Sequence, residues 1–262
     1  MAAEAAGLAS RSYGTVTSAV PADRARLRNQ GALLKEVREL LTLSRGYGME
    51  SVRQRAMSTA ETVSASLSEV VDDSTLELVV DLRLAFGRLL AALGANERAE
   101  KEHLDTAELS LSQGWTETAC AALALASHAA QARGDRASSG RAWRKCREAM
   151  GAWPMNRPGE RCGTLVDAVG DPLVALQVLS ALAEILVDGV EEDHSRAPII
   201  REIISRASEQ TSRCVNPPQG AVESLARVEE RIAPYGRGRG GRRRPGSTTT
   251  IRTDGRAASE GE

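Results

Sequence analysis

The sequence predicts an all-α protein, and three observations favour that class. Aromatic residues make up only 3% of the chain, and Ala, Leu and Val supply most of its apolar content. Small aliphatic side chains suit closely packed helices better than a β-sandwich. Runs that alternate apolar and polar residues, which are typical of strands, are almost absent. The chain has 262 residues, enough for a sizeable core in one large or two small domains.

The N-terminal half of the chain divides into four expected helices. The first covers residues 21–45 and ends at the stretch RGYG. The second has an apolar face made of Val52, Ala56, Val63 and Leu67. Ser74 and Glu77 form a capping box, which predicts a third helix that runs to about Leu93. Asn96 is a suitable N-cap for the fourth.

The C-terminal half begins with a helix that should lie centrally. The stretch TACAALALASHAAQA is small and apolar on nearly every side, so it needs cover on several faces. Residues 151–171 are expected to be the longest irregular segment of the body. Further helices are expected to start at the cap Asp135, at Asp171-Pro172, near Pro198, and over residues 219–233.

Glycine-ended turns recur between these helices. The stretches LTLSRGYG, LAALGAN, AQARGDR and EILVDGVEE each end an apolar helix and open a polar-capped one. Their glycines are Gly48, Gly94, Gly134 and Gly189. The recurrence indicates a repeating helix–turn–helix unit, and such units stack because one hairpin alone cannot bury its apolar face.

The turn at Gly94 resembles the tetratricopeptide-repeat family. In that family a small residue in the first helix lets the second helix pack close, and a glycine seven positions later forms the turn. Gly87 and Gly94 match these two positions, Phe86 precedes the first, and Ala99 matches the small residue of the second helix. The two glycines are therefore expected to be a close-contact site and a helix C-cap.

Other units depart from the family pattern. The corresponding residues of the third unit are Ser127 and Ser139, and the first unit has Leu41 at the small position. The resemblance covers about residues 22–213 and implies stacked antiparallel helical hairpins that form an α-solenoid. A generic array of helical hairpins and an irregular helical bundle are the alternatives.

The resemblance also implies a binding surface, because the first helices of such units line the concave side. The residues expected to bind a partner there are Lys35, Arg38, Arg45, Arg88, His128 and Gln131. Their chemistry favours an acidic peptide or one with a free C-terminal carboxylate. The alternative is that these cations only form the solvated face of surface helices. Apolar positions of the fourth unit are expected to be covered by the helix over residues 219–233.

The ends of the chain differ from this body. Residues 1–20 are expected to be a disordered leader, 21–233 the helical-repeat domain, and 234–262 a disordered Arg/Gly-rich tail. The segment from Tyr235 to Glu262 carries about four net positive charges and the rest of the chain about five net negative ones. Such a tail suggests RNA or DNA binding through Arg237, Arg239, Arg242, Arg243 and Arg244. A tail that only solubilises the protein is the alternative.

No pattern for catalysis, metal binding or membrane insertion stands out. The cysteines are far apart and form no CxxC pair, so reduced, mostly buried thiols are expected. No stretch approaches 18 consecutive apolar residues, and no nucleotide fingerprint has the strand and helix that it requires. The sequence therefore favours a non-enzymatic, cytoplasmic interaction scaffold without a cofactor, with nucleic-acid binding through the tail, and a nuclear location, as the alternative.

Overall fold

The computed structural model describes residues 21–67, 76–153 and 157–236, and every regular element in these ranges is helical. The all-α class predicted from the sequence is therefore confirmed. The elements are α1 (Pro21–Tyr47), η2 (Met49–Val52), α2 (Arg53–Leu67), α3 (Leu76–Ala92), α4 (Asn96–Ser112), α5 (Thr116–Ala132), α6 (Arg136–Gly151), α7 (Pro158–Val169), α8 (Pro172–Val187), α9 (Arg196–Arg213), α10 (Gln219–Ile232) and η4 (Ala233–Gly236).

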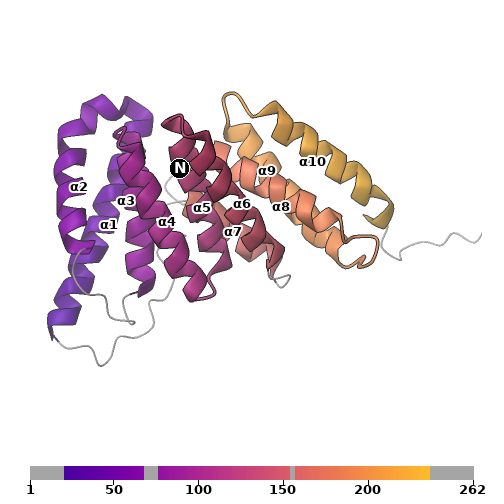
Figure 1. The fold of residues 1–262 in the computed structure, drawn as a ribbon, viewed down its shortest axis with the longest axis horizontal. Helices are drawn as coiled ribbons and strands as arrows, with labels where there is room; N and C mark the ends of the chain where they lie inside the picture. Colours follow the sequence, from indigo (N-terminus) through magenta and orange to yellow (C-terminus); the bar gives the residue numbers. More distant parts are fainter. Residues whose placement is uncertain (1–20, 68–75, 154–156, 237–262) are drawn as a thin grey trace, which may run out of the picture.

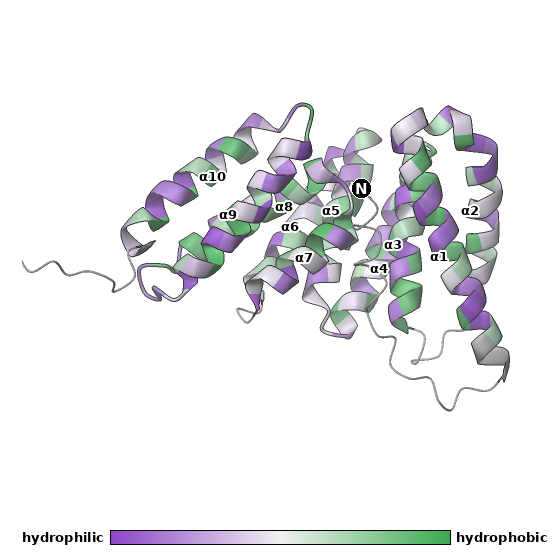
Figure 2. Ribbon diagram, turned by 180° about the vertical axis from the view of Figure 1, so that it is seen from behind, coloured by the Kyte–Doolittle hydropathy of each residue, from purple (hydrophilic) through white to green (hydrophobic). Residues whose placement is uncertain are grey.

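The helices follow one another along the long axis of the molecule, with α1 to α4 at one end and α8 to α10 at the other (Figure 1). Successive helices pack against each other from α3 to α6, and α8 packs against α9 and α10. Polar and apolar residues are interleaved along the helices, as expected for amphipathic helices in a row (Figure 2). The buried apolar residues form two clusters, one mainly from α1 to α3 and one mainly from α5 to α10.

Three tight turns share one hydrogen-bond pattern. Gly94 has φ +84°, its N–H donates to the carbonyl of Ala91, and the N–H of Ala95 donates to the carbonyl of Leu90. This is the Schellman pattern, in which a left-handed glycine lets the turn satisfy the last carbonyls of a helix. Gly114 and Gly134 repeat it, at φ +71° and +83°. The predicted C-cap at Gly94 is confirmed.

The equal spacing of these three glycines gives the hairpins α3–α4 and α5–α6 the same turn and nearly equal helix lengths, with matching residues 40 positions apart. Gly114, which was not predicted as a repeat glycine, completes this series. The predicted N-cap at Asn96 is wrong by one position. Ala95 takes that place because the Schellman turn already fixes it, and Asn96 is the first residue of α4.

Gly87 is the close-contact site that its position predicted. A Cβ atom at Gly87 would lie 2.4 Å from Cε1 of His103, which is buried against it from α4. In the next hairpin the matching residue is Ser127, whose hydroxyl lies 3.0 Å from both the carbonyl oxygen and the hydroxyl of Ser139. The two hairpins therefore close their helix crossings differently, one by a bare backbone and one by paired hydroxyls.

The central helix is α5, which contacts α3, α4, α6, α7 and α8. Its small apolar side chains are buried nearly all round, as the sequence predicted. The expected cap at Asp135 is also present, since its carboxylate accepts from the N–H of Ser138 at 2.9 Å. Asp171 caps α8 in the same way, with Oδ1 2.9 Å from the N–H of Leu173 and 3.1 Å from that of Val174.

The expectation of an irregular segment over residues 151–171 is wrong, because most of it is the helix α7. Cys162, Leu165 and Val169 share one face of α7 and are fully buried. The helix packs against α5, α8 and α9. It is therefore a single helix inserted between the hairpin α5–α6 and the pair α8–α9.

The structure differs from the sequence predictions in smaller ways near α9. The helix expected near Pro198 begins at Arg196. Gly189 is not left-handed, unlike the other three predicted turn glycines. The tail was expected over residues 234–262, but its first three residues belong to η4. The expected leader over residues 1–20, the capping residue Ser74 and residues 237–262 of the tail lie outside the described residues.

Candidate functional site

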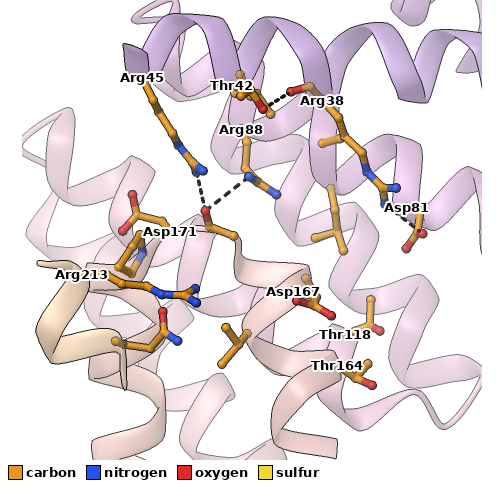
Figure 3. A pocket seen from close by; sticks show the side chains of 18 residues that line it. Arg38, Thr42, Arg45, Asp81, Arg88, Thr118, Thr164, Asp167, Asp171 and Arg213 are labelled. Carbon is orange, nitrogen blue, oxygen red and sulfur yellow. Dashed lines mark hydrogen bonds and ion pairs between the residues drawn. The ribbon is translucent and has the colours of Figure 1, made fainter. Parts of the chain in front are cut away.

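A cavity of about 470 Å³ lies between α1 and α3 on one side and α7 and α9 on the other (Figure 3). Its polar lining includes Arg38, Thr42 and Arg45 of α1, Asp81 and Arg88 of α3, Thr118 of α5, Thr164 and Asp167 of α7, and Arg213 of α9. Arg38, Thr42 and Arg45 share the cavity because spacings of four and three place them on one helix face. Asp81 and Arg88, seven residues apart, share the facing side of α3 for the same reason.

The first cation of the cavity is neutralised by a neighbour. Nη2 of Arg38 lies 3.3 Å from Oδ2 of Asp81, which joins α1 to α3. The Arg38 side chain is 48% exposed, so the ion pair adds little to stability. Its main effect on the cavity is that Arg38 and Asp81 cancel each other's charge.

The next two cations meet at one carbonyl oxygen. Gly170 ends α7 in the left-handed conformation, with φ +59°. Its carbonyl accepts a hydrogen bond from Nη2 of Arg45 and a long one, 3.5 Å, from Nη2 of Arg88 (Figure 3). The carbonyls at the C-terminus of a helix carry partial negative charge, which favours cations there. Arg45 and Arg88 therefore fasten α1 and α3 to the end of α7.

Crowding of these cations affects the guanidinium of Arg88. Burial, together with repulsion by Arg45 and then Arg38, lowers the pKa of Arg88 to about 10, while Asp171 opposes the shift. The group remains charged at neutral pH. Arg88 thus lies near other positive charges that the nearby carboxylates do not fully balance.

Three of the cavity arginines have no carboxylate within ion-pair distance in the described part of the chain: Arg45, Arg88 and Arg213. Four arginines between other helices are paired with carboxylates: Arg83 with Glu102, Arg133 with Glu100, Arg147 with Glu184, and Arg161 with Glu117. Arg201 of α9 instead donates to the carbonyl of Ile232. Asp171 lines the same cavity, but its Oδ1 is engaged by the N-terminus of α8.

The residues expected to bind a partner are only partly brought together. Arg38, Arg45 and Arg88 line the cavity. Lys35 and His128 are exposed and do not line it. Gln131 lines a second cavity of about 770 Å³ between α5, α6, α8 and α10. The five tail arginines from Arg237 to Arg244 lie outside the described residues.

Arg213 belongs to the cavity but was missed in the sequence. It is the last residue of α9, and no spacing within the chain links it to Arg45 or Arg88. Only the packing of α9 against α7 brings it there. Gly170 was missed for a similar reason, since α7 was not expected.

The rest of the described chain offers little for metal or thiol chemistry. No group of three or more His, Cys, Asp or Glu residues in it is placed to hold a metal ion. Cys120, Cys146 and Cys162 are buried free thiols and Cys214 is partly exposed, as expected. Burial raises the pKa of Cys162 to about 12, so its thiolate is suppressed. Among the described helices, none has the length and apolar character needed to cross a membrane.

Comparison with known proteins adds no family to this description. Neither a protein-family model, nor a curated protein sequence, nor a solved structure matches the chain. The resemblance to tetratricopeptide repeats therefore stays an expectation from the sequence, and the site is argued from its geometry.

The close approach of Arg88 to Gly170 predicts that a larger residue at position 170 destabilises the protein. A Cβ atom at Gly170 would lie 2.3 Å from Nη2 of Arg88, and φ is positive. We expect Gly170→Ala to lower the free energy of unfolding by about 1–2 kcal/mol from backbone strain and to displace the guanidinium as well. Chemical denaturation measures the loss.

Gly48→Ala is the matched control, because Gly48 has φ +83° and open space around it. The free energy of unfolding that Gly48→Ala loses should therefore come from backbone strain alone. In a background of Arg88→Ala, the cost of Gly170→Ala should fall, whereas the cost of Gly48→Ala should not change. Equal costs of Gly170→Ala in both backgrounds would contradict the contact.

Proposed function

We propose that this protein is a non-enzymatic interaction scaffold that binds a segment of a partner protein in the cavity of Arg38, Arg45 and Arg88. The observation that carries the proposal is the origin of the cavity walls. The first helices of three successive hairpins, α1, α3 and α5, contribute to the cavity, and their second helices α2, α4 and α6 do not. A concave surface lined by first helices is how stacked helical hairpins present a binding site.

The shape of the molecule supports the same function. An array of helices in chain order (Figure 1) creates an extended surface, because each helix pair contacts mainly its neighbours. The two matching hairpins α3–α4 and α5–α6 favour a repeat architecture of the tetratricopeptide kind. The helix α7 modifies that architecture, since it closes one end of the cavity with Thr164 and Asp167.

Charge reversal in the cavity tests the proposal. In an affinity purification with the full chain as bait, Arg38→Glu combined with Arg88→Glu should reduce the recovery of specific partners about tenfold or more. The cause is repulsion of a negatively charged segment, because the two changes leave Asp81 without its cation, add a carboxylate beside it and replace the positive charge of Arg88 by a negative one. Quantitative mass spectrometry of the retained proteins measures the change.

Two comparisons make the result specific. Arg144→Glu combined with Arg227→Glu changes the charge equally at exposed positions outside the cavity and should leave recovery unchanged. Circular dichroism should show that both double variants keep their helices. If both double variants recover the same partners at the same level, the cavity is not the binding site.

Nucleic-acid binding through the tail is the second candidate, supported by the five arginines among glycines at residues 237–244. Deletion of residues 235–262 separates the two functions. RNA binding that is lost with the tail and that falls steeply with added salt would favour the second candidate. Partner recovery that survives the deletion favours the first.

A further inference from the structure

We propose that the second cavity, between α5, α6, α8 and α10, binds single-stranded nucleic acid, with phosphates on its arginines and a base against Trp143. This site shares no lining residue with the cavity of Arg38, Arg45 and Arg88, and it does not include the arginines of the tail. The inference goes beyond the scaffold function and does not depend on it.

One face of α6 forms a wall of this cavity. Ser139, Gly140, Trp143 and Arg147 follow Arg136 at spacings of three, four, seven and eleven residues, which place all five on the same side of the helix. The helix carries four arginines and one lysine but only one acidic residue, within a body that is negatively charged overall. This wall is therefore locally positive, and clustered positive charge attracts phosphates.

The charges inside the cavity leave one cation without a counter-charge. The Glu184 carboxylate accepts a hydrogen bond from the hydroxyl of Ser224, and its Oε2 lies 3.6 Å from Nη1 of Arg147. Arg136 is exposed, lines the cavity, and has no carboxylate within ion-pair distance in the described ranges. A guanidinium pairs well with phosphate oxygens through two parallel N–H groups. Arg136 is therefore the main phosphate contact, and Arg147 is the second.

Three other side chains of the cavity suit a base. Trp143 packs against the apolar core and also lines the cavity, where its indole offers a surface for stacking. Gln131 and Gln177 line the cavity as well, and neither side chain has a hydrogen bond to a described residue. An amide both donates and accepts hydrogen bonds, as the edges of unpaired bases do. Bases can be stacked and bonded in this way only when they are unpaired, which favours a single strand over a duplex.

The cavity has room for a base and its sugar. Its volume of about 770 Å³ falls within the range of about 300–1,000 Å³ that is typical of ligand sites. Gly140 of α6 and Gly220 of α10 lie on its walls, and neither has an atom within 4 Å of the position of an added Cβ. A strand can therefore approach the backbone of both helices.

Fluorescence anisotropy with labelled strands of about 12 nucleotides tests the inference. The protein is the full chain with the five tail arginines from Arg237 to Arg244 changed to glutamine, so that binding by the tail does not hide the site. The probes are one sequence as single-stranded RNA, as single-stranded DNA and as a duplex, and an abasic strand of the same length. We expect the single strand with bases to bind about tenfold or more tightly than the abasic strand, because stacking of one base supplies about that factor. The comparison of RNA with DNA identifies the polymer.

Two pairs of variants locate the site. Arg136→Gln should weaken binding and reduce the slope of log K against log salt by about 0.7, the value for one phosphate contact on a single strand. Lys145→Gln, nine residues further along and thus on the opposite side of α6, should leave the slope unchanged. Gly140→Glu places a carboxylate in the cavity and should weaken binding about tenfold, although glutamate is the better helix former. Ala226→Glu, at an exposed position of α10 outside the cavity, should not weaken binding.

Tryptophan fluorescence reports on the base directly. Binding should quench the fluorescence of the protein but not that of Trp143→Phe, because neither Trp115 nor Trp153 lines the cavity. Equal affinity for the strands with and without bases, tighter binding of the duplex, or unchanged binding by Gly140→Glu overturns the inference, and so does the absence of binding to every probe. Each of these results leaves the scaffold function standing, since that function is tested with variants of the other cavity.

Discussion

Gly87→Ala should destabilise the protein by about 1–3 kcal/mol, although alanine is the better helix former by about 1 kcal/mol. The new methyl group would lie 2.4 Å from Cε1 and 2.8 Å from both ring nitrogens of His103. The imidazole is buried, and protein interiors are close-packed, so we expect α4 to move away from α3 or the ring to leave its rotamer. Thermal and chemical unfolding measure the loss.

The helix α6 supplies the matched control. Gly140 lies in the interior of α6, is exposed, and has no atom within 4 Å of the position of an added Cβ. Gly140→Ala should therefore stabilise the protein by about 0.5–1 kcal/mol. The opposite signs of the two substitutions separate helix propensity from packing.

A double-mutant cycle locates the cause in one contact. His103→Ala removes the ring and leaves a cavity that costs several kcal/mol, as large-to-small substitutions in a core do. In that background, Gly87→Ala should become stabilising, because it fills part of the cavity and improves the helix. A Gly87→Ala variant that stabilises the unmodified protein as Gly140→Ala does would contradict the packing model.

This contact also shows how far the sequence predicts the fold. The resemblance to tetratricopeptide repeats implied a close approach at Gly87 and a helix end at Gly94, and both are present. Glycine inside a helix is costly, so the pair called for a local reason. The identity of the neighbour was not predictable, since nothing in the sequence distinguishes His103 from other residues of α4 as the side chain that packs on Gly87.

The helix α7 could not be predicted from its local sequence. Pro158, Gly159 and Gly163 all lower helix propensity or signal a turn, so its sequence favours an irregular segment. Cys162, Leu165 and Val169 do recur at helical spacing, but twelve residues are too few for this pattern to outweigh the glycines. Burial against α5 and α9 decides the structure of this segment, and burial depends on the whole fold.

Some residues of the candidate site were likewise predictable from the sequence and others were not. Arg38 and Arg45 were predictable as one face of a helix from their spacing, and Arg88 was expected beside them only because the resemblance to tetratricopeptide repeats implies that first helices line one surface. Arg213 and Gly170 come from segments whose position depends on α7. Their contribution to the cavity therefore became visible only when the packing of α7 and α9 was known.

Acid should destabilise the protein through His103. Burial, assisted by repulsion from Arg88, lowers the pKa of His103 to about 3, against about 6.5 in an unfolded chain. Between these pH values the unfolded chain binds a proton that the folded protein does not bind. The free energy of unfolding therefore falls as the pH falls below about 6.5, by about 1.4 kcal/mol per pH unit once the unfolded histidine is protonated, and His103 contributes no pH dependence above that range.

Urea denaturation at a series of pH values from 7.5 to 4.5 measures this effect. We expect a loss of roughly 2 kcal/mol over this range that is absent in His103→Met, a replacement of similar size that cannot be protonated. His128→Gln, at an exposed histidine, should keep the slope of the unmodified protein. Burial raises the pKa of Glu102, which acts in the opposite direction, and its contribution cancels in the comparison because each variant retains it. If His103→Met loses as much stability in acid as the unmodified protein, the imidazole is not held neutral at the crossing of α3 and α4.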